Sequence, residues 1–443
     1  MPTYGSTTEI PTTEVTVESG STVSISLGFN ATVGLVGSYD DDNGSATAGE
    51  VVQVSSTRDA RDKFGADSEL HRAVEQAYAN GAVTVYAVAL PVTETTESVS
   101  GSSGTLTNVP LFDPRVTTHE ITVQDTTDAS SETVVVNYSD SLSAANSGEF
   151  VVNPLTGDYN DDGDGNDYDI TYEYTTSTEY SDAVTNIADE NLRYLALLTE
   201  VESRINEGVT EAETRDDDFN FFRVIGGVTP ETDPDNYDNN IDSQRCALVA
   251  PPRAYDEDNE SGEVRTVATY AGKLTGKPLG DSTTFETLDN LVDLNQKFAN
   301  SEIEKWLNAG DNQNFTQVTP LKQDTGIKVI KDHTTSSDAK FNRIFATEIV
   351  DEATEGSHQI SENYIGELNS PANRRVLEDQ HVTLYNSFID NIPPLLDDFD
   401  VAVSENDTNV NAVDVEIGLD VVNVIDKVNV NITVGDIITN EQG

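Results

Sequence analysis

Basic residues and cysteines are both scarce in this chain. Its 443 residues include 24 Lys and Arg against 80 Asp and Glu, so the formal net charge is -56. A nucleic acid or an anionic membrane would be repelled by nearly every face of so acidic a protein, and we expect neither as a direct partner. The single cysteine, Cys246, cannot pair within the chain, which excludes a disulfide framework. Cys246 lies in the apolar run CALVAPP, which indicates that its side chain is a small buried hydrophobic group and not a catalytic thiol.

The first ten residues, MPTYGSTTEI, contain no basic residue and no apolar stretch. We therefore expect neither a signal peptide nor a membrane anchor, and we expect the protein to be made and folded in a cytoplasm. Hydrophobic residues make up 36% of the chain, and its long apolar runs argue against disorder. The favoured alternative is a halophilic folded protein, because at 1 M salt the Debye length falls to about 3 Å and self-repulsion is screened.

Catalytic and cofactor-binding motifs are also missing. The five histidines are dispersed without metal-ligand spacing, and no G-x-S-x-G elbow occurs. The stretch AGKLTGKP, residues 271–278, resembles a phosphate loop, but its glycine spacing is one residue short and Pro278 replaces the metal-binding hydroxyl residue. We therefore expect no enzymatic activity and no required cofactor.

One acidic stretch, DYNDDGDGNDYD at residues 158–169, fits part of a calcium loop. Its candidate ligands at loop positions 1, 3, 5, 7 and 12 are Asp158, Asn160, Asp162, Asp164 and Asp169. The last of these is shorter than the usual bidentate Glu, and the flanks have strand patterns where helices belong. The favoured interpretation is an acidic, solvated hairpin, and bound Ca²⁺ is the alternative.

The stretch from Val51 to Leu90 predicts the centre of the core. A β-rich run at 51–55 precedes a predicted helix that is capped by Asp67 and ended by Asn80-Gly81. The apolar run 83–90 then predicts a strand covered on both faces, as in a parallel sheet. Together these segments predict a strand, helix, strand crossover.

This stretch also carries a resemblance to a known family. The sequence TVGLVGS at residues 32–38, the Phe64-Gly65 turn, the helix ending in Ala79-Asn80-Gly81 and the strand VTVYAVAL resemble the opening of contractile tail sheath proteins. Such proteins occur in tailed viruses and related injection systems. The order of elements from Ser301 to about Val434 is similar to the inner domain of these proteins.

The fold class that follows is an α/β (α+β) sheath core with an inserted all-β domain and extended terminal strands. Four alternating strand patterns between residues 106 and 174 predict the insertion, which resembles a small sandwich. A Ser/Thr/Gly-rich connector, residues 91–108, precedes it. An apolar stripe from Ala183 to Ile205 predicts one long helix after it. The predicted segments are an N-terminal arm (1–31), core (32–95), insertion (96–180), core with inner helices (181–400) and a C-terminal arm (401–443).

The two ends of the chain alternate apolar and polar residues like half-buried strands. The last run is more than twice the length of a typical strand, about 5 to 6 residues, so it either crosses a large sheet or leaves its own domain. We expect these arms to pair with neighbouring subunits. The residues predicted to lie in these strands are Val15, Val17, Val23, Ile25, Val422, Val424, Val428, Val430, Ile432 and Val434.

Arg374 and Arg375 form a basic pair in a chain with few cations. One interpretation is that they pair with nearby carboxylates such as Glu378. The other is that they contact an acidic tube surface or a neighbouring subunit. The sequence leaves both open.

The resemblance implies a structural function. Subunits would stack as six-membered rings in a helical sheath around a tail tube, together with baseplate and tail terminator proteins. Contraction would drive the tube through a target cell envelope, delivering a genome or effectors. The expected location is a virion tail assembled in the host cytoplasm, or an injection particle. The alternatives are a halophilic surface adhesin with a calcium-stabilised β-domain, and an enzyme with an unrecognised site.

Overall fold

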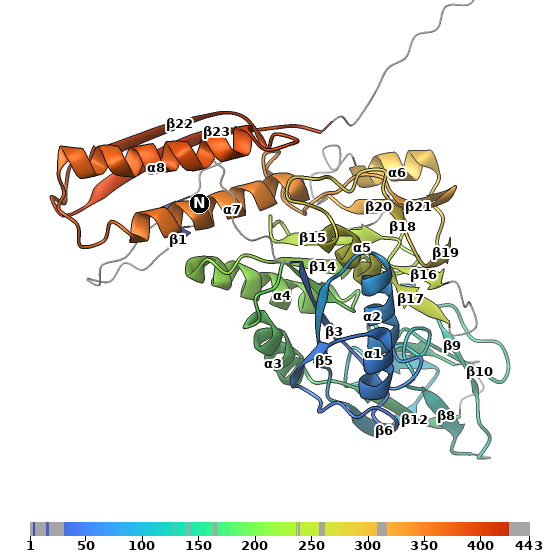
Figure 1. Ribbon diagram of the computed structural model, residues 1–443. Helices are drawn as coiled ribbons and strands as arrows, with labels where there is room; N and C mark the ends of the chain where they lie inside the picture. Colours follow the sequence, from blue (N-terminus) through green and yellow to red (C-terminus); the bar gives the residue numbers. More distant parts are fainter. Residues whose placement is uncertain are drawn as a thin grey trace, which may run out of the picture.

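A computed structural model describes most of the chain between residues 31 and 424. The described ranges are 31–127, 129–139, 142–161, 163, 166–235, 237, 240–256, 262–307 and 317–424, with two short strands, β1 (Thr3–Tyr4) and β2 (Val15–Thr16). Figure 1 shows a central sheet flanked by helices, with one unit projecting at each end.

The elements follow one another through three regions. The first core segment and the β-rich region contain β3 (Thr32–Gly37), β4 (Val51–Val54), α1 (Thr57–Phe64), α2 (Glu69–Ala79), β5 (Thr84–Ala89), β6 (Thr93–Ser100), β7 (Ser103–Thr105), β8 (Thr122–Asp125), β9 (Thr133–Val136), β10 (Glu149–Val152), β11 (Asp158–Asn160) and β12 (Asp167–Tyr174). The second core segment contains α3 (Ser177–Ala188), β13 (Tyr194–Leu197), α4 (Glu202–Arg215), η1 (Asp216–Asp218), β14 (Arg223–Gly227), β15 (Cys246–Ala250), β16 (Arg253–Asp256), β17 (Glu263–Arg265), α5 (Thr266–Thr275), β18 (Thr287–Leu288), β19 (Leu291–Leu294), α6 (Asn300–Leu307), β20 (Thr319–Asp324) and β21 (Gly326–Val329). The last region contains α7 (Ile344–Glu362), α8 (Pro371–Ile389), β22 (Leu396–Glu405) and β23 (Val413–Val421).

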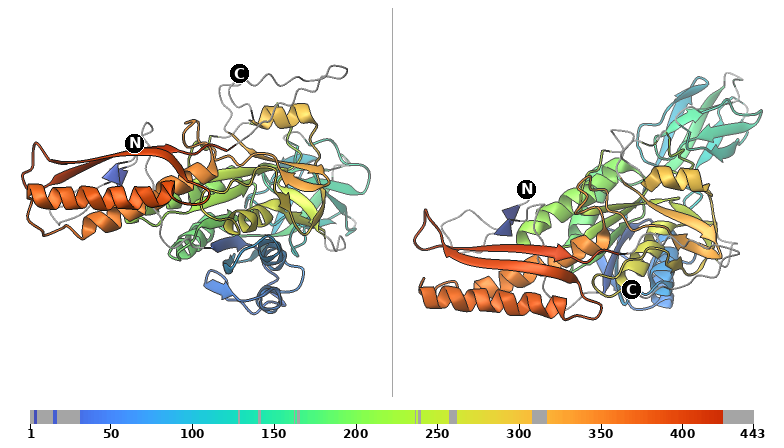
Figure 2. Two further views of the ribbon diagram at one scale, coloured as in Figure 1. Left: turned by 45° about the horizontal axis from the view of Figure 1, so that its top comes forward. Right: turned by 90° about the horizontal axis from the view of Figure 1, so that it is seen from above.

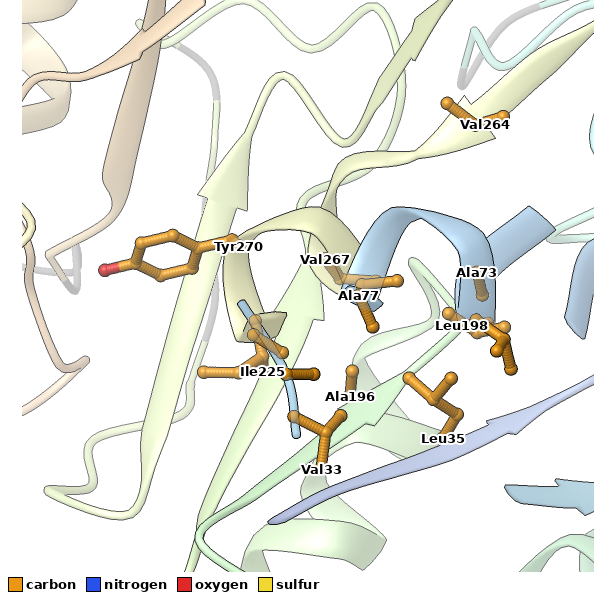
Figure 3. Close-up of a cluster of buried hydrophobic side chains, with 14 of the residues drawn as sticks. Val33, Leu35, Ala73, Ala77, Ala196, Leu198, Ile225, Val264, Val267 and Tyr270 are labelled. Carbon is orange, nitrogen blue, oxygen red and sulfur yellow. The ribbon is translucent and has the colours of Figure 1, made fainter. Parts of the chain in front are cut away.

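The central sheet has nine strands in the order β18-β21-β20-β15-β14-β13-β3-β5-β4. Strands β5, β3, β13, β14, β15 and β20 run parallel to one another. Apolar side chains of α2 and α5 cover one face, and those of α3 and α4 cover the other. Figure 3 shows the first cluster, where Val33 and Leu35 of β3 meet Ala77 of α2 and Val267 of α5. This arrangement explains why the strands at the centre are apolar on both faces.

The crossover predicted at the start of the chain exists, but with a different first strand. Strand β3 is parallel to β5, whereas β4 is antiparallel to β5 at the edge of the sheet. The prediction that residues 51–55 open a parallel crossover was therefore wrong. Ser68, not Asp67, caps α2, since its hydroxyl accepts a hydrogen bond from the His71 N–H.

The single helix predicted from Ala183 to Ile205 was also wrong. This stretch contains the end of α3, the central strand β13 and the start of α4. All four residues of β13 are fully buried, and a short apolar run buried on both faces satisfies helix and strand spacing equally.

Residues 93–174 form two small sheets around one apolar cluster. Their strand orders are β7-β11-β10-β9 and β6-β12-β8, and the cluster includes Phe150, Tyr159, Tyr168 and Ile170. The predicted connector at 91–108 contains β6 and β7, and α3 begins at Ser177, so the predicted boundaries at 96 and 180 are displaced at both ends. The edge strand β6 could not be recognised from apolar alternation, because its sequence, TETTESVS, is almost entirely polar.

Helices α7 and α8 and the hairpin β22–β23 form a second unit with its own cluster, which includes Phe345, Tyr385, Phe388 and Leu396. Two views show this unit and residues 93–174 at opposite ends of the molecule (Figure 2). The predicted boundary at residues 400/401 falls inside β22. The hairpin packs on α8 and belongs to the same unit as the two helices.

Candidate functional site

The crevice where doubly wound folds bind ligands is filled here by protein side chains. The chain passes from β3 to β5 on one side and later to β13 on the other, so the topological switch point lies at the carboxyl ends of β3 and β13. At that point Glu69 Oε2 accepts a hydrogen bond of 2.8 Å from the Ser38 N–H. Arg265 forms ion pairs with both Glu69 and Glu200.

A second arginine extends this network toward residues 93–174. Arg253 is fully buried and lies 2.8 Å from Glu200 and 2.7 Å from Asp113. Burial alone would raise the pKa of Glu200, but Arg253 and Arg265 hold that pKa below its ordinary value. The carboxylates therefore stay ionised and paired. These pairs connect the core to Asp113, which precedes β8.

A cavity of about 460 Å³ lies beside the network at the ends of β13 and β14. Its described lining includes no basic residue and four carboxylates: Glu200, Glu202, Glu231 and Asp233. Such a lining repels anionic ligands such as nucleotides. The cavity is therefore unsuited to the phosphate groups that this crevice binds in dinucleotide-binding folds.

Buried arginines are a general feature of this chain. Seven have 9% or less of their surface exposed: Arg72, Arg193, Arg204, Arg223, Arg245, Arg253 and Arg265. Because the chain has only 24 basic residues, burial of these seven leaves 17 for the rest of the molecule.

Three of these arginines attach α7 to the central sheet, an arrangement that we call the α7 clamp. Arg193, Arg223 and Arg245 stand at the amino ends of β13, β14 and β15, next to one another in the sheet. Arg193 pairs with Glu348 at 2.7 Å, and both Arg223 and Arg245 pair with Asp351. Glu348 and Asp351 are three residues apart, so they share one face of α7.

Asp216 completes the α7 clamp from η1, at 2.8 Å from Arg245. Sequence reasoning missed this clamp. The available signal was an arginine at the start of each of three buried strands: RYLAL, RVIGG and RCALVA.

The predicted basic pair divides into one paired and one free residue. Arg374 Nη1 lies 2.8 Å from Glu405 of β22 and also donates to Asn369. Arg375 is exposed and has no ion-pair partner among the residues that the structure describes. Neither pairs with Glu378 there.

The residues predicted as strand arms lie mostly outside the described part of the chain. Strand β2 pairs with β1, placing Val15 opposite Tyr4. Val422 and Val424 follow β23 and are half-buried, and the Val422 N–H donates to Leu395. Outside the described residues lie Val17, Val23, Ile25, Val428, Val430, Ile432 and Val434.

Strands β22 and β23 pair only with each other among the described strands. Each therefore presents one edge that can accept a further strand.

The described calcium-loop candidates lie on two different sheets. Asp158 and Asn160 belong to β11, and Asp169 belongs to β12. Asp158 accepts hydrogen bonds from Thr105 and Thr156, and Asp169 accepts one from Ser98. Asp162 and Asp164 are outside the described residues, so Ca²⁺ binding stays a prediction.

The sequence matches a family model described as DUF2586, N-terminal domain, over residues 31–435. The chain belongs to the DUF2586 family. No curated protein matches this DUF2586 chain. No helix in its described part is both long enough and apolar enough to cross a membrane.

Several solved structures share the fold. The anti-feeding prophage helical sheath in its contracted state aligns at 12% identity with a TM-score of 0.57, covering 97% of this chain and 100% of that chain. The sheath of an extracellular contractile injection system, PVC, also in its contracted state, aligns at 10% identity with a TM-score of 0.57, covering 97% and 99%. The sheath tail protein Lin1278 from Listeria innocua aligns at 15% identity with a TM-score of 0.54, covering 90% and 94%. The DUF2586 chain therefore has a mixed α/β fold like that of sheath proteins, and these neighbours are structural proteins.

Proposed function

We propose that this DUF2586 protein is the subunit of a contractile sheath. The observation that carries this proposal is a likeness of fold over the whole length of two contracted sheath proteins. The filled switch-point crevice supports a structural role over an enzymatic one, because the fold's usual ligand position is used for packing.

The hairpin β22–β23 suggests how subunits connect. Its two open edges are 10 and 9 residues long and lie on the unit that projects from the core (Figure 1). Terminal strands of neighbouring copies could extend this sheet by β-augmentation. The predicted arm residues, among them Val428 to Val434, would then form backbone hydrogen bonds with a strand of a second copy.

During contraction each subunit would move as a rigid body, and the exchanged strands would keep neighbouring subunits connected. The α7 clamp holds α7 to the sheet through buried charge pairs, so the core and the helical unit would rotate together. In this proposal the sheath stacks as hexameric rings around a tail tube, with baseplate and terminator proteins at its ends. The particle is a virion tail or an injection system, and genome or effector delivery is its outcome.

Electron microscopy tests the assembly. Full-length protein in high salt should form tubes or stacked rings, and protein lacking residues 425–443 should stay as folded single subunits, because β23 ends at Val421. Tubes from the shortened protein would refute the strand exchange. Monodisperse full-length monomers, with or without a tube protein added, would refute the sheath and favour an adhesin.

A charge reversal tests the surface at α8. Arg375→Glu is preferable to a change at Arg374, whose pair with Glu405 supports the hairpin. If Arg375 faces a tube or a neighbour, Arg375→Glu should reduce assembly, while Lys340→Glu, another exposed basic residue, should not. Equal assembly by both variants would remove Arg375 from the interface.

A further inference from the structure

Three potential metal ligands from distant segments meet beside the β-rich region. One ring nitrogen of His119 and one carboxylate oxygen from each of Asp41 and Glu173 lie within 4.8 Å of one another. Asp41 lies in the connection between β3 and β4, His119 precedes β8, and Glu173 belongs to β12. The group therefore lies where the first core segment meets residues 93–174.

The histidine is held rigidly in this group. Its side chain is 4% exposed, and its ring stacks on Phe112 with the centroids 4.5 Å apart. Nδ1 lies 2.7 Å from Glu173 Oε2, whereas the buried Nε2 has no hydrogen-bond partner among the described residues. A metal ion between Nδ1 and Glu173 would replace the proton that these two atoms share, and the ring proton would then lie on Nε2.

Within the described ranges, the two carboxylates of this group have no arginine or lysine partner of the kind that several buried acids have. Asp113, Glu200 and Glu348 each face an arginine. In the described part of the chain, Asp41 accepts no hydrogen bond, and the only ion-pair partner of Glu173 is His119. Two neighbouring carboxylates with one imidazole attract a cation.

We infer that Asp41, His119 and Glu173 form a site for a divalent transition metal of the Zn²⁺ class. Such ions bind imidazole nitrogen and carboxylate oxygen at about 2.0–2.2 Å, and tetrahedral ligands around them lie about 3.4 Å apart. The three ligand atoms lie within 4.8 Å of one another, and Nδ1 and Glu173 Oε2 would separate from 2.7 Å to about 3.4 Å when an ion takes the place of their shared proton. An imidazole ligand disfavours Ca²⁺ and Mg²⁺, which take oxygen ligands. The exposed Asp41 leaves the site accessible from solvent.

The bound ion connects the core to residues 93–174, because it joins Asp41 to Glu173. It therefore adds a cross-link at the same junction as the Arg253 pairs with Asp113 and Glu200. This site is independent of sheath assembly, and it is separate from the Asp158 to Asp169 stretch.

Calorimetry with Zn²⁺ on the full chain tests the site, in 1 M KCl with excess Mg²⁺ to suppress diffuse binding to this acidic surface. We expect one Zn²⁺ per chain, and at least about tenfold weaker binding for Asp41→Asn, since even loss of an outer-shell group costs about 10–100-fold. Asp41 is exposed, so this variant should fold, and Asp42→Asn is the matched control that should bind like the natural protein.

Co²⁺ provides the second readout. Bound Co²⁺ should give visible absorption bands of a low-symmetry site, and Glu173→Gln and His119→Ala should lose them. Zn²⁺ binding that is absent, or equal in Asp41→Asn and Asp42→Asn, would overturn the proposal.

Discussion

Removing Asp351 should loosen the whole α7–α8 unit from the central sheet. The substitution Asp351→Asn leaves Arg223 without its carboxylate and Arg245 with Asp216 alone. Breaking a buried ion pair from one side costs about 3–5 kcal/mol, because the remaining charge stays buried. We expect about 3 kcal/mol, the lower end, because the Asp351 side chain is 12% exposed and Asp216 still neutralises Arg245.

Hydrogen exchange and thermal unfolding measure this effect. Amides of α7, α8, β22 and β23 should exchange faster in Asp351→Asn, while those of β3, β13 and β14 should change little. A fall of about 3 °C in Tm is expected for a chain of this length. The loss should persist at high salt, since buried pairs are weakly screened.

The matched control is Glu355→Gln, which removes the same charge one turn further along α7. Burial raises the pKa of Glu355, so its ionised form is disfavoured in the fold, and this substitution should not destabilise the protein at neutral pH. Equal melting and equal exchange in the two variants would refute the α7 clamp.

Further predictions concern Asp216, Gly272 and Trp306. Burial raises the pKa of Asp216 to about 6, above its unfolded value, so the native state holds this proton longer and the associated stability is lost as pH rises from about 4 to 6. The free energy of unfolding of the natural protein minus that of Asp216→Asn should fall by about 1.4 kcal/mol per pH unit in that window, and a flat difference in denaturant titrations would contradict this pKa. Gly272→Ala would place a Cβ 2.4 Å from the Ala77 carbonyl oxygen of α2, so it should cost about 1–3 kcal/mol by chemical denaturation despite alanine's better helix propensity. Trp306 is fully buried against Tyr237 and Phe298, so its fluorescence should be blue-shifted and should move to longer wavelength when α6 detaches; a red-shifted native emission would contradict its packing.

The strongly periodic elements could be predicted from the sequence, and the polar or short ones could not. The helix after Ser68 and the strand at Thr84–Ala89 follow from their apolar spacing. Strands β6 and β22 are rich in Thr, Glu and Asp, and their pairing depends on β12 and β23. Whether β4 runs parallel or antiparallel to β5 depends on tertiary packing, which the local pattern does not contain.

The functional residues were harder to predict because their contacts are non-local. Arg223 and Asp351 are 128 residues apart, and in so acidic a chain any arginine has many possible partners. Asp41, His119 and Glu173 come from three segments, so no spacing motif contains them. The resemblance to sheath proteins came from the order of elements, which survives even where individual strands were misassigned.

The burial of so many arginines has a consequence for digestion. Proteases that cut after lysine or arginine cannot reach at least seven of the 24 candidate positions in the folded protein, because these lie inside the fold. Cleavage beside Arg223, Arg245 or Arg253 requires the central sheet to open first. Trypsin cleavage at these three positions would therefore report on the opening of the interior.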